Sequence, residues 1–224
     1  MELGQNWHNL TYEEAIKALA SSYAGLSERE AHERLSHYGA NRLKEKGRAS
    51  PWLILLKQFA SPLVYILFIA VIIEAFVLHN PTDAGVILLI VLVNAVIGFG
   101  QELRAERALE ALRKLTTPMA RVRRNNVEHN IPASHLVPGD IMILKGGDKV
   151  PADGRLLETS SLSVDESPLT GESVPIEKFT SPIKGWVPLA DMGNMVHMGT
   201  SVADGRGIAV VTATGMETQF GRIV

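Results

Sequence analysis

The 224-residue sequence contains no cysteine, which excludes a disulfide framework and a thiolate metal site. This composition fits a reducing compartment without establishing one. The seven histidines lack the spacing of metal ligands, and the sequence has no Walker motif and no glycine-rich dinucleotide loop. Residues 1–10 also lack the apolar core of a secretory signal peptide.

The sequence has almost no excess of charge of either sign. Its 22 basic and 24 acidic residues give a formal net charge of −2, so no electrostatic attraction to nucleic acid is expected. Hydrophobic residues make up 46% of the chain, which is ordinary for a globular protein. Their distribution is uneven, however, and that unevenness is informative.

Two apolar runs, at about residues 59–78 and 84–100, have roughly the length of membrane-crossing helices. The short connection between them contains Pro81. Neither run shows the polar stripe of a soluble surface helix. We therefore expect residues 51–117 to form a transmembrane helical hairpin and stalk, with the lipid bilayer as a partner. The alternative is a soluble β-domain protein with a buried helical hairpin, and partitioning into detergent would exclude it.

Basic residues flank the two runs, and the connection between them has none. The positive-inside rule then predicts an integral protein of the cell membrane with both ends cytosolic. The flanking residues are Arg42, Lys44, Lys46, Arg48 and Lys57 before the first run, and Arg104, Arg107, Arg113 and Lys114 after the second.

The second helix is expected to continue beyond the membrane as a stalk. Residues 101–115 are rich in strong helix formers and contain no Gly or Pro, and Pro118 marks the end. Glu74 is the single acid within the predicted spans. An ionisable group there is costly and often functional, so Glu74 is a possible ion-path residue. The alternative is that it reaches the outer interface.

Residues 1–50 form a lead-in with two capping boxes, Thr11–Glu14 and Ser27–Glu30. These predict short helices at about residues 12–21 and 28–38, with Gly39 in a positive-φ conformation after the second. Apolar residues on both helices indicate that they pack against another part of the protein. We interpret the lead-in as a docking element without chemistry.

Residues 118–224 alternate short β-prone runs with dense turn residues, which predicts a compact all-β domain. The whole chain is thus expected to be a multi-part α+β protein. The predicted strands are 121–124, 128–131, 141–144, 154–158, 174–177 and 207–214. Pro168 and Gly171 favour a turn that presents Glu172 at a loop tip. A solvated turn is the more usual role of such a loop, and no partnering base, nucleophile or metal cluster is visible near it.

Several motifs, in order along the chain, resemble those of the P-type cation-transporting ATPases of the calcium or sodium/potassium type. Leu169-Thr170-Gly171-Glu172-Ser173 is similar to the signature of their actuator domain. The resemblance extends over essentially the whole chain. The other similar stretches are Trp7-His8, residues 39–43, the stalk pattern 94–106, Pro138-Gly139-Asp140-Ile141, residues 147–154, Met198-Gly199-Thr200 and residues 214–221.

This resemblance implies a distorted jelly-roll fold for the actuator domain and a pump that forms an aspartyl-phosphate from ATP and Mg²⁺ and then hydrolyses it. Glu172 would act as general base on water in the later step. Gly171 would leave space for a phosphate, and the hydroxyls of Thr170 and Ser173 would hold the loop. The stalk would couple rotation of the domain to movement of the hairpin.

The family's phosphorylated Asp-Lys-Thr-Gly-Thr does not occur in the sequence. The resemblance therefore implies a piece of a pump whose phosphorylation domain, nucleotide-binding domain and later transmembrane helices are its partners, together with the transported cation. We expect this chain alone to be inactive. The stalk pattern favours a calcium-type pump. The alternative is a non-enzymatic, membrane-anchored regulatory or binding module derived from the actuator domain.

Overall fold

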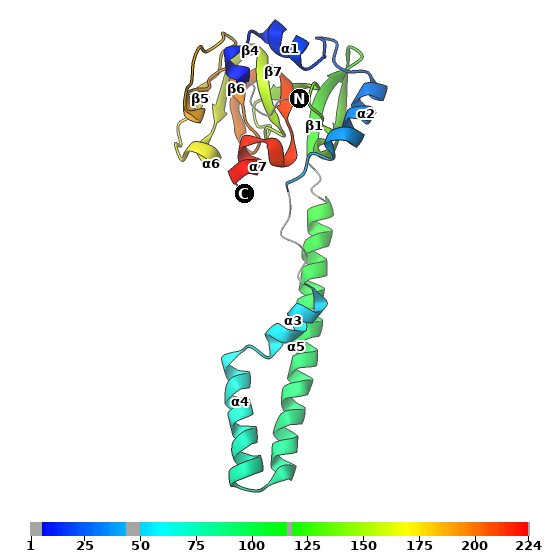
Figure 1. Cartoon of the computed structure of the whole chain (residues 1–224), viewed down its shortest axis with the longest axis vertical. Coiled ribbons are helices and arrows are strands. Elements are labelled where there is room, and N and C mark those ends of the chain that lie inside the picture. The colour runs from blue at the N-terminus through cyan, green and yellow to red at the C-terminus, as the bar shows by residue number, and fades with distance from the viewer. Residues whose placement is uncertain (1–5, 44–49, 116–117, 224) are drawn as a thin grey trace. The chain divides into compact units, whose positions relative to one another are not determined.

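The computed structural model describes residues 6–43, 50–115 and 118–223, and it consists of two compact units (Figure 1). One unit combines residues 1–44 with residues 117–224, and the other comprises residues 45–116. The lead-in and the β-rich segment thus belong to one unit although the apolar helices separate them in sequence.

The first unit is built on a seven-stranded sheet whose strand pairs are antiparallel. The strand order is β2-β1-β3-β7-β4-β5, with β6 also paired to β4. The long strands β4 and β7 pair through several register shifts, which bend the sheet. The strands are β1 (Met119–Arg124), β2 (Val127–Pro132), β3 (Ile141–Lys145), β4 (Asp153–Asp165), β5 (Ile176–Glu177), β6 (Met195–Val196) and β7 (Ser201–Ala213).

The apolar core of this unit lies on the sheet and includes the fully buried side chains of Leu136, Met142, Leu156 and Leu162. Burial of apolar side chains of this size is the main force that stabilises such a domain. The short helical segments around it are η3 (Ala133–His135), α6 (Ser167–Thr170), η4 (Leu189–Asp191), η5 (Gly215–Glu217) and α7 (Gln219–Ile223).

The lead-in helices pack against the β-rich segment, in agreement with the prediction that they pack against another part of the protein. After η1 (Trp7–Asn9), the helix α1 (Tyr12–Ala18) places Ala15, Ile16 and Leu19 against Ile141 of β3 and its neighbours. The helix α2 (Glu28–Tyr38) contributes Ala31 to a cluster with Leu26 and Val137.

The helix boundaries of the lead-in follow the capping signals. Both capping boxes, Thr11–Glu14 and Ser27–Glu30, are formed, and Gly39 has a φ of 78°. The helix predicted over residues 12–21 ends earlier, at Ala18, because Ala20 adopts a left-handed conformation with φ 45° and cannot continue the helix.

The second unit consists of apolar helices (Figure 1). They are α3 (Pro51–Gln58), α4 (Pro62–Ile72), the π-helical turn η2 (Ile73–Val77) and α5 (Pro81–Leu115). α4 and α5 pack against each other, and so do α3 and α5. The predicted long second helix is therefore formed, and it begins three residues earlier than expected. Its segment from Pro81 to Ala108 is long and apolar enough to cross a membrane.

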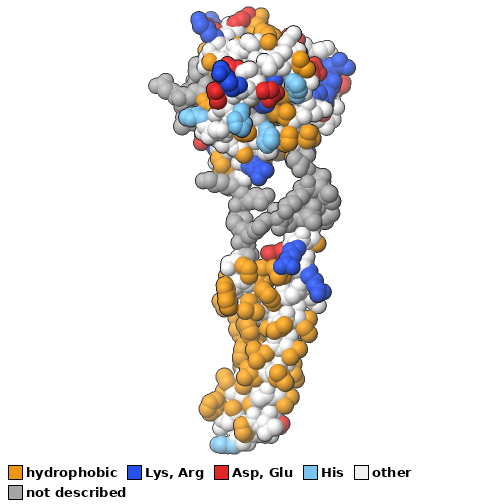
Figure 2. Space-filling view, turned by 90° about the vertical axis from the view of Figure 1, so that its right-hand side faces the viewer, with side chains coloured by type: hydrophobic (Ala, Val, Ile, Leu, Met, Phe, Trp, Pro, Cys, Tyr) orange, Lys and Arg blue, Asp and Glu red, His pale blue; other side chains and the backbone are white. Residues whose placement is uncertain are grey.

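The predicted first span, residues 59–78, is helical over Pro62–Val77, and a further helix, α3, precedes it across a break at residues 59–61. α3 and the α4–η2 segment pass the same test only as a pair, and they meet at an angle of 60°. Pro62 lacks an amide hydrogen and disfavours a helical conformation at Ser61, whose hydroxyl caps the new helix at the amide of Val64. Figure 2 shows that hydrophobic side chains cover the visible face of these helices.

Three strand predictions differ from the structure in extent. The predicted strand 154–158 is longer, since β4 runs over Asp153–Asp165. The run 174–177 forms a strand only at Ile176–Glu177, since Pro175 cannot donate to a sheet. β7 begins at Ser201 rather than residue 207: residues 201–206 are mostly polar and give no strand signal, yet they pair with β4. The two-residue strand β6 and the short helices give no periodic signal and were not predicted.

Candidate functional site

The four predicted site residues lie together in the connection between β4 and β5. β4 ends at Asp165, the single-turn helix α6 follows over Ser167–Thr170, and Gly171 ends it with a φ of 79°. Only glycine adopts this conformation without strain, and it is a common way to end a helix. The chain then runs through Glu172 and Ser173 to β5.

The tip of this connection is exposed. Residues 171–175 are all solvent-exposed, and a Cβ atom added at Gly171 would meet no atom of the described residues within 4 Å. Within the tip, the amide of Gly171 donates to the carbonyl of Ser167 at 3.0 Å, and that of Glu172 donates to the Thr170 hydroxyl at 3.2 Å. The carboxylate of Glu172 is therefore accessible to a group outside this unit.

A buried ion pair closes the base of the same connection. Nζ of Lys178, just after β5, lies 2.6 Å from Oε1 of Glu166, just before α6. Burial raises the pKa of Glu166 and lowers the pKa of Lys178, while each charge favours the ionised form of the other. We missed this pair in the sequence, because two charged residues 12 positions apart look like exposed loop residues.

A second buried polar group lies at the start of β4. The Asp153 carboxylate accepts hydrogen bonds from the amides of Met198 (2.8 Å) and Gln219 (2.7 Å), and burial raises its pKa to about 6. Burial, reinforced by the charge of Lys178, lowers the pKa of His197 to about 3. At neutral pH the 3.9 Å contact between His197 Nδ1 and Asp153 is therefore not an ion pair.

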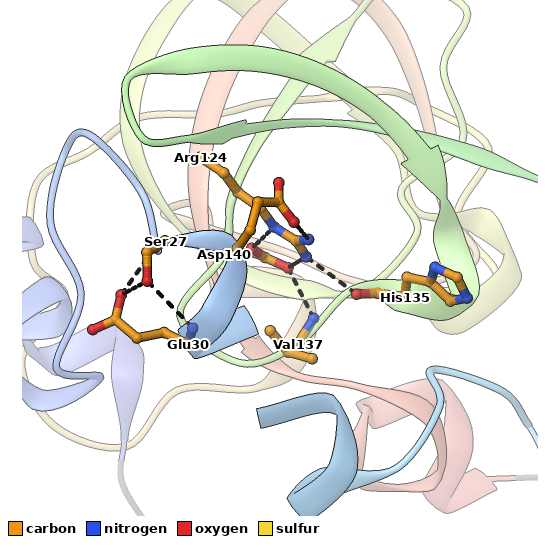
Figure 3. Close-up of polar contacts among 7 residues, drawn as sticks. Ser27, Glu30, Arg124, His135, Val137 and Asp140 are labelled. Atoms are coloured by element: carbon orange, nitrogen blue, oxygen red, sulfur yellow. Dashed lines mark hydrogen bonds and ion pairs between the residues drawn. The ribbon is translucent and has the colours of Figure 1, made fainter. Parts of the chain in front are cut away.

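Other residues of the predicted motifs stabilise the unit and do not lie in the exposed loop. Asp140, in Pro138-Gly139-Asp140, pairs with Arg124 of β1 and also accepts from the amide of Val137 at 3.0 Å (Figure 3). Arg124 also donates to the carbonyl of His135. The motif thus fixes the turn before β3.

Among the described residues, no group of three or more His, Asp or Glu side chains could hold a metal ion. Glu74 lies half-buried in the π-helical turn η2, where its carbonyl accepts from the amide of Asn80 at 2.9 Å. π-helical turns often occur at functional sites, so Glu74 stays a candidate ion-path residue.

The loop and its scaffold match a known family. Residues 114–224 match the P-type ATPase actuator domain, and residues 7–74 match the N-terminus of cation transporters and ATPases. Together the two matches cover most of the chain in the expected order. The chain belongs to the P-type ATPases, and it contains their N-terminal and actuator portions.

Its relatives agree with this assignment. The chain is 45% identical to calcium-transporting ATPase 1 of Bacillus cereus over 97% of its own length, and 45% identical to the probable cation-transporting ATPase F of Mycobacterium tuberculosis over 96%. It is 46% identical to the cation-transporting ATPase pma1 of Synechocystis over 89%. The chain spans 25%, 24% and 22% of these three relatives.

Proposed function

We propose that this chain serves as the N-terminal and actuator portion of a pump that couples turnover of an aspartyl-phosphate to cation transport, and that Glu172 promotes hydrolysis of that phosphate. The observation that supports the proposal is the exposed Glu172 carboxylate, which lies on a loop whose two ends are joined by the buried ion pair of Glu166 and Lys178. Such a loop can enter a second domain without unfolding its own.

In the proposed step, the carboxylate of Glu172 orients a water molecule and accepts its proton. The water oxygen bonds to phosphorus while the bond from phosphorus to the aspartyl oxygen breaks, which releases inorganic phosphate and a free aspartate. Gly171 permits close approach because no side chain stands there. The Thr170 hydroxyl holds the Glu172 amide, and Ser173 is a further hydroxyl at the loop tip.

ATP and Mg²⁺ belong, in this proposal, to domains outside these 224 residues, because the phosphorylated motif of the family does not occur in them. The sheet corresponds to the distorted jelly roll of the family's actuator domain. The described residues do not determine which cation is transported. The names of several relatives and the stalk pattern of residues 94–106 favour Ca²⁺.

We further propose that α4–η2 and α5 form a transmembrane hairpin with the first unit in the cytosol. The basic flanks support this orientation. The division of the chain into units supports an even number of membrane crossings. The residues before and after 45–116 pack into one unit, so both ends of the membrane segment must reach the same side. The stalk portion of α5 would then transmit movement of the actuator to the hairpin.

A chimeric pump tests the role of Glu172. The chain replaces the matching quarter of the Bacillus cereus relative, and the formation and decay of phosphoenzyme are followed with labelled ATP. We expect Glu172→Gln to leave phosphoenzyme formation intact and to slow its decay by about 100-fold, the scale of a lost general base.

Glu177→Gln is the matched control, because Glu177 is an exposed glutamate on β5, five residues beyond Glu172. It should leave both rates unchanged. Decay of normal speed in Glu172→Gln would remove the general-base role. A correctly folded chimera that forms no phosphoenzyme would instead favour the non-enzymatic regulatory module.

A further inference from the structure

The ion pair at the base of the loop has no role in the proposed chemistry, yet it lies where both ends of the loop meet. Glu166 is 1% exposed and Lys178 4% exposed. Between them stand α6, the exposed tip and β5. The contact thus joins the two ends of a connection whose tip has few contacts of its own.

The main chain of Glu166 is linked to the tip. Its carbonyl accepts hydrogen bonds from the amide of Thr170 at 3.0 Å and from the hydroxyl of Thr170 at 3.1 Å. The same hydroxyl accepts from the amide of Glu172 at 3.2 Å. Movement of Glu166 would therefore be transmitted through Thr170 to the backbone of Glu172.

On the other side, Lys178 is fixed to the sheet, because its amide donates to the carbonyl of Leu162 in β4 at 2.8 Å. The ammonium group thus extends from a residue that is hydrogen-bonded to β4, and it holds Glu166 from the side. The end of β4 and the contact with Lys178 together position the start of α6, and α6 in turn positions the loop tip.

Stability alone does not account for this pair. Desolvation of two charges offsets most of their attraction, and well-packed apolar residues are often as stabilising. The second carboxylate oxygen, Oε2 of Glu166, is buried and has no hydrogen-bond partner among the described residues, which adds to the desolvation cost of the pair. An ion pair at 2.6 Å does, however, fix the relative position of two segments more narrowly than apolar contact.

We propose that Glu166 and Lys178 are positioning residues, which fix the place of Glu172 relative to the sheet without touching the reacting atoms. This role rests on the function proposed above for Glu172. It predicts that an apolar replacement of the pair leaves the unit folded and lets the loop tip sample a wider range of positions.

The test uses the full chain in detergent with two spin labels. Because the sequence has no cysteine, Ser173→Cys and Val127→Cys give two unique labelling sites, and both positions are exposed. Val127 lies on β2, at the opposite end of the strand order from β5. Pulsed electron paramagnetic resonance then measures the distribution of distances between the two labels.

In Glu166→Leu/Lys178→Met we expect the distance distribution to widen at least twofold while the unfolding temperature stays close to that of the parent. The control is the exposed ion pair Glu217→Gln/Arg222→Gln, which lies on η5 and α7, outside both the loop and β2, and should leave the width unchanged. Should the double variant not fold, Glu166→Gln alone, which preserves shape, serves in its place. An unchanged width, or equal widening in the control, would overturn the proposal.

The same variants in the chimeric pump separate this inference from the function of Glu172. If the distribution widens and phosphoenzyme decay slows at least tenfold, with formation unchanged, both proposals are supported. If it widens and decay is unaffected, the positioning role stands and the role of Glu172 fails. If the width is constant, the positioning role fails whatever the decay rate.

Discussion

Arg124 and Asp140 form a two-point ion pair inside the first unit, with Nε to Oδ1 and Nη2 to Oδ2 both at 2.8 Å. Arg124 is 5% exposed and Asp140 is fully buried. Arg124 also reaches Glu28 of α2 at 3.4 Å, so the pair connects the sheet with the lead-in. Figure 3 shows the two side chains face to face beside the capping box of α2.

Asp140→Asn should strongly destabilise this unit, because the buried guanidinium of Arg124 would keep its charge and lose its counter-ion. The expected loss in the free energy of unfolding is about 3–5 kcal/mol. Urea unfolding of the detergent-solubilised chain measures it. Glu128→Gln is the control: its 4.0 Å contact with Arg123 is half-exposed, so it should cost no more than about 1 kcal/mol.

Gly171 and Gly205 have the same φ of 79° and different surroundings, which gives a matched pair of variants. Gly171→Ala should cost only the left-handed strain, about 1–2 kcal/mol, since the added methyl group meets open space. Gly205→Ala should cost more, because its Cβ would overlap the carbonyl of Ser161. Thermal unfolding gives the order of the two variants.

If Gly171 permits phosphate approach, then Gly171→Ala should also slow phosphoenzyme decay in the chimeric pump although the unit remains folded. If phosphoenzyme decays as fast in the variant as in its parent, Gly171 keeps only the helix-ending role that its φ defines.

The buried His197 should make the unit sensitive to acid. Its pKa in the folded chain is about 3, below its ordinary 6.5, so the unfolded chain binds the proton more readily and stability falls as pH drops from about 6.5 toward 3. Asp153 acts in the opposite direction: its folded pKa of about 6 exceeds 3.8, so its contribution rises as pH drops from about 6 to 4.

His197→Leu removes the first effect and leaves the second. Relative to the parent, this variant should gain about 2 kcal/mol of stability between pH 7 and pH 5, at up to about 1.4 kcal/mol for each pH unit. Urea unfolding of both chains at the two pH values measures the difference. Parallel pH dependence of variant and parent would show that His197 is not held neutral by burial.

The proposed orientation can be tested by labelling single cysteines in intact cells. We expect a membrane-impermeant maleimide to label Thr82→Cys, at the start of α5, and to leave Lys184→Cys of the first unit unlabelled until the cells are permeabilised. Both positions are exposed. Labelling of Lys184→Cys in intact cells would place the actuator on the wrong side for a P-type ATPase of the proposed kind.

Local signals in the sequence predicted the elements whose cause is local. The capping boxes at Thr11 and Ser27 fixed the starts of α1 and α2, and the helix-forming run to Leu115 fixed the extent of α5. The exposed position of Glu172 also followed from its turn residues, with Gly171 as predicted in a conformation that favours glycine.

Non-local features were missed, because their partners are far apart in sequence. The pairing of Glu166 with Lys178 and the burial of His197 depend on how β4, β5 and β6 come together, which no short stretch encodes. The helix α3 and the break that follows it were missed for another reason. The apolar run was read from residue 59, whereas the helix starts at Pro62, because hydropathy alone does not register the missing amide hydrogen of proline.

The closing of the first unit by distant segments bears on how the protein is made. The carbonyl of His8 accepts from the side chain of Asn194, 186 residues later. At the usual rate of synthesis, that interval takes roughly 10–40 s. The sheet under α1 is incomplete until β7, the strand between β3 and β4, has also been made, so the nascent chain exposes the apolar face of α1 for at least this time and chaperones are suited to shield it.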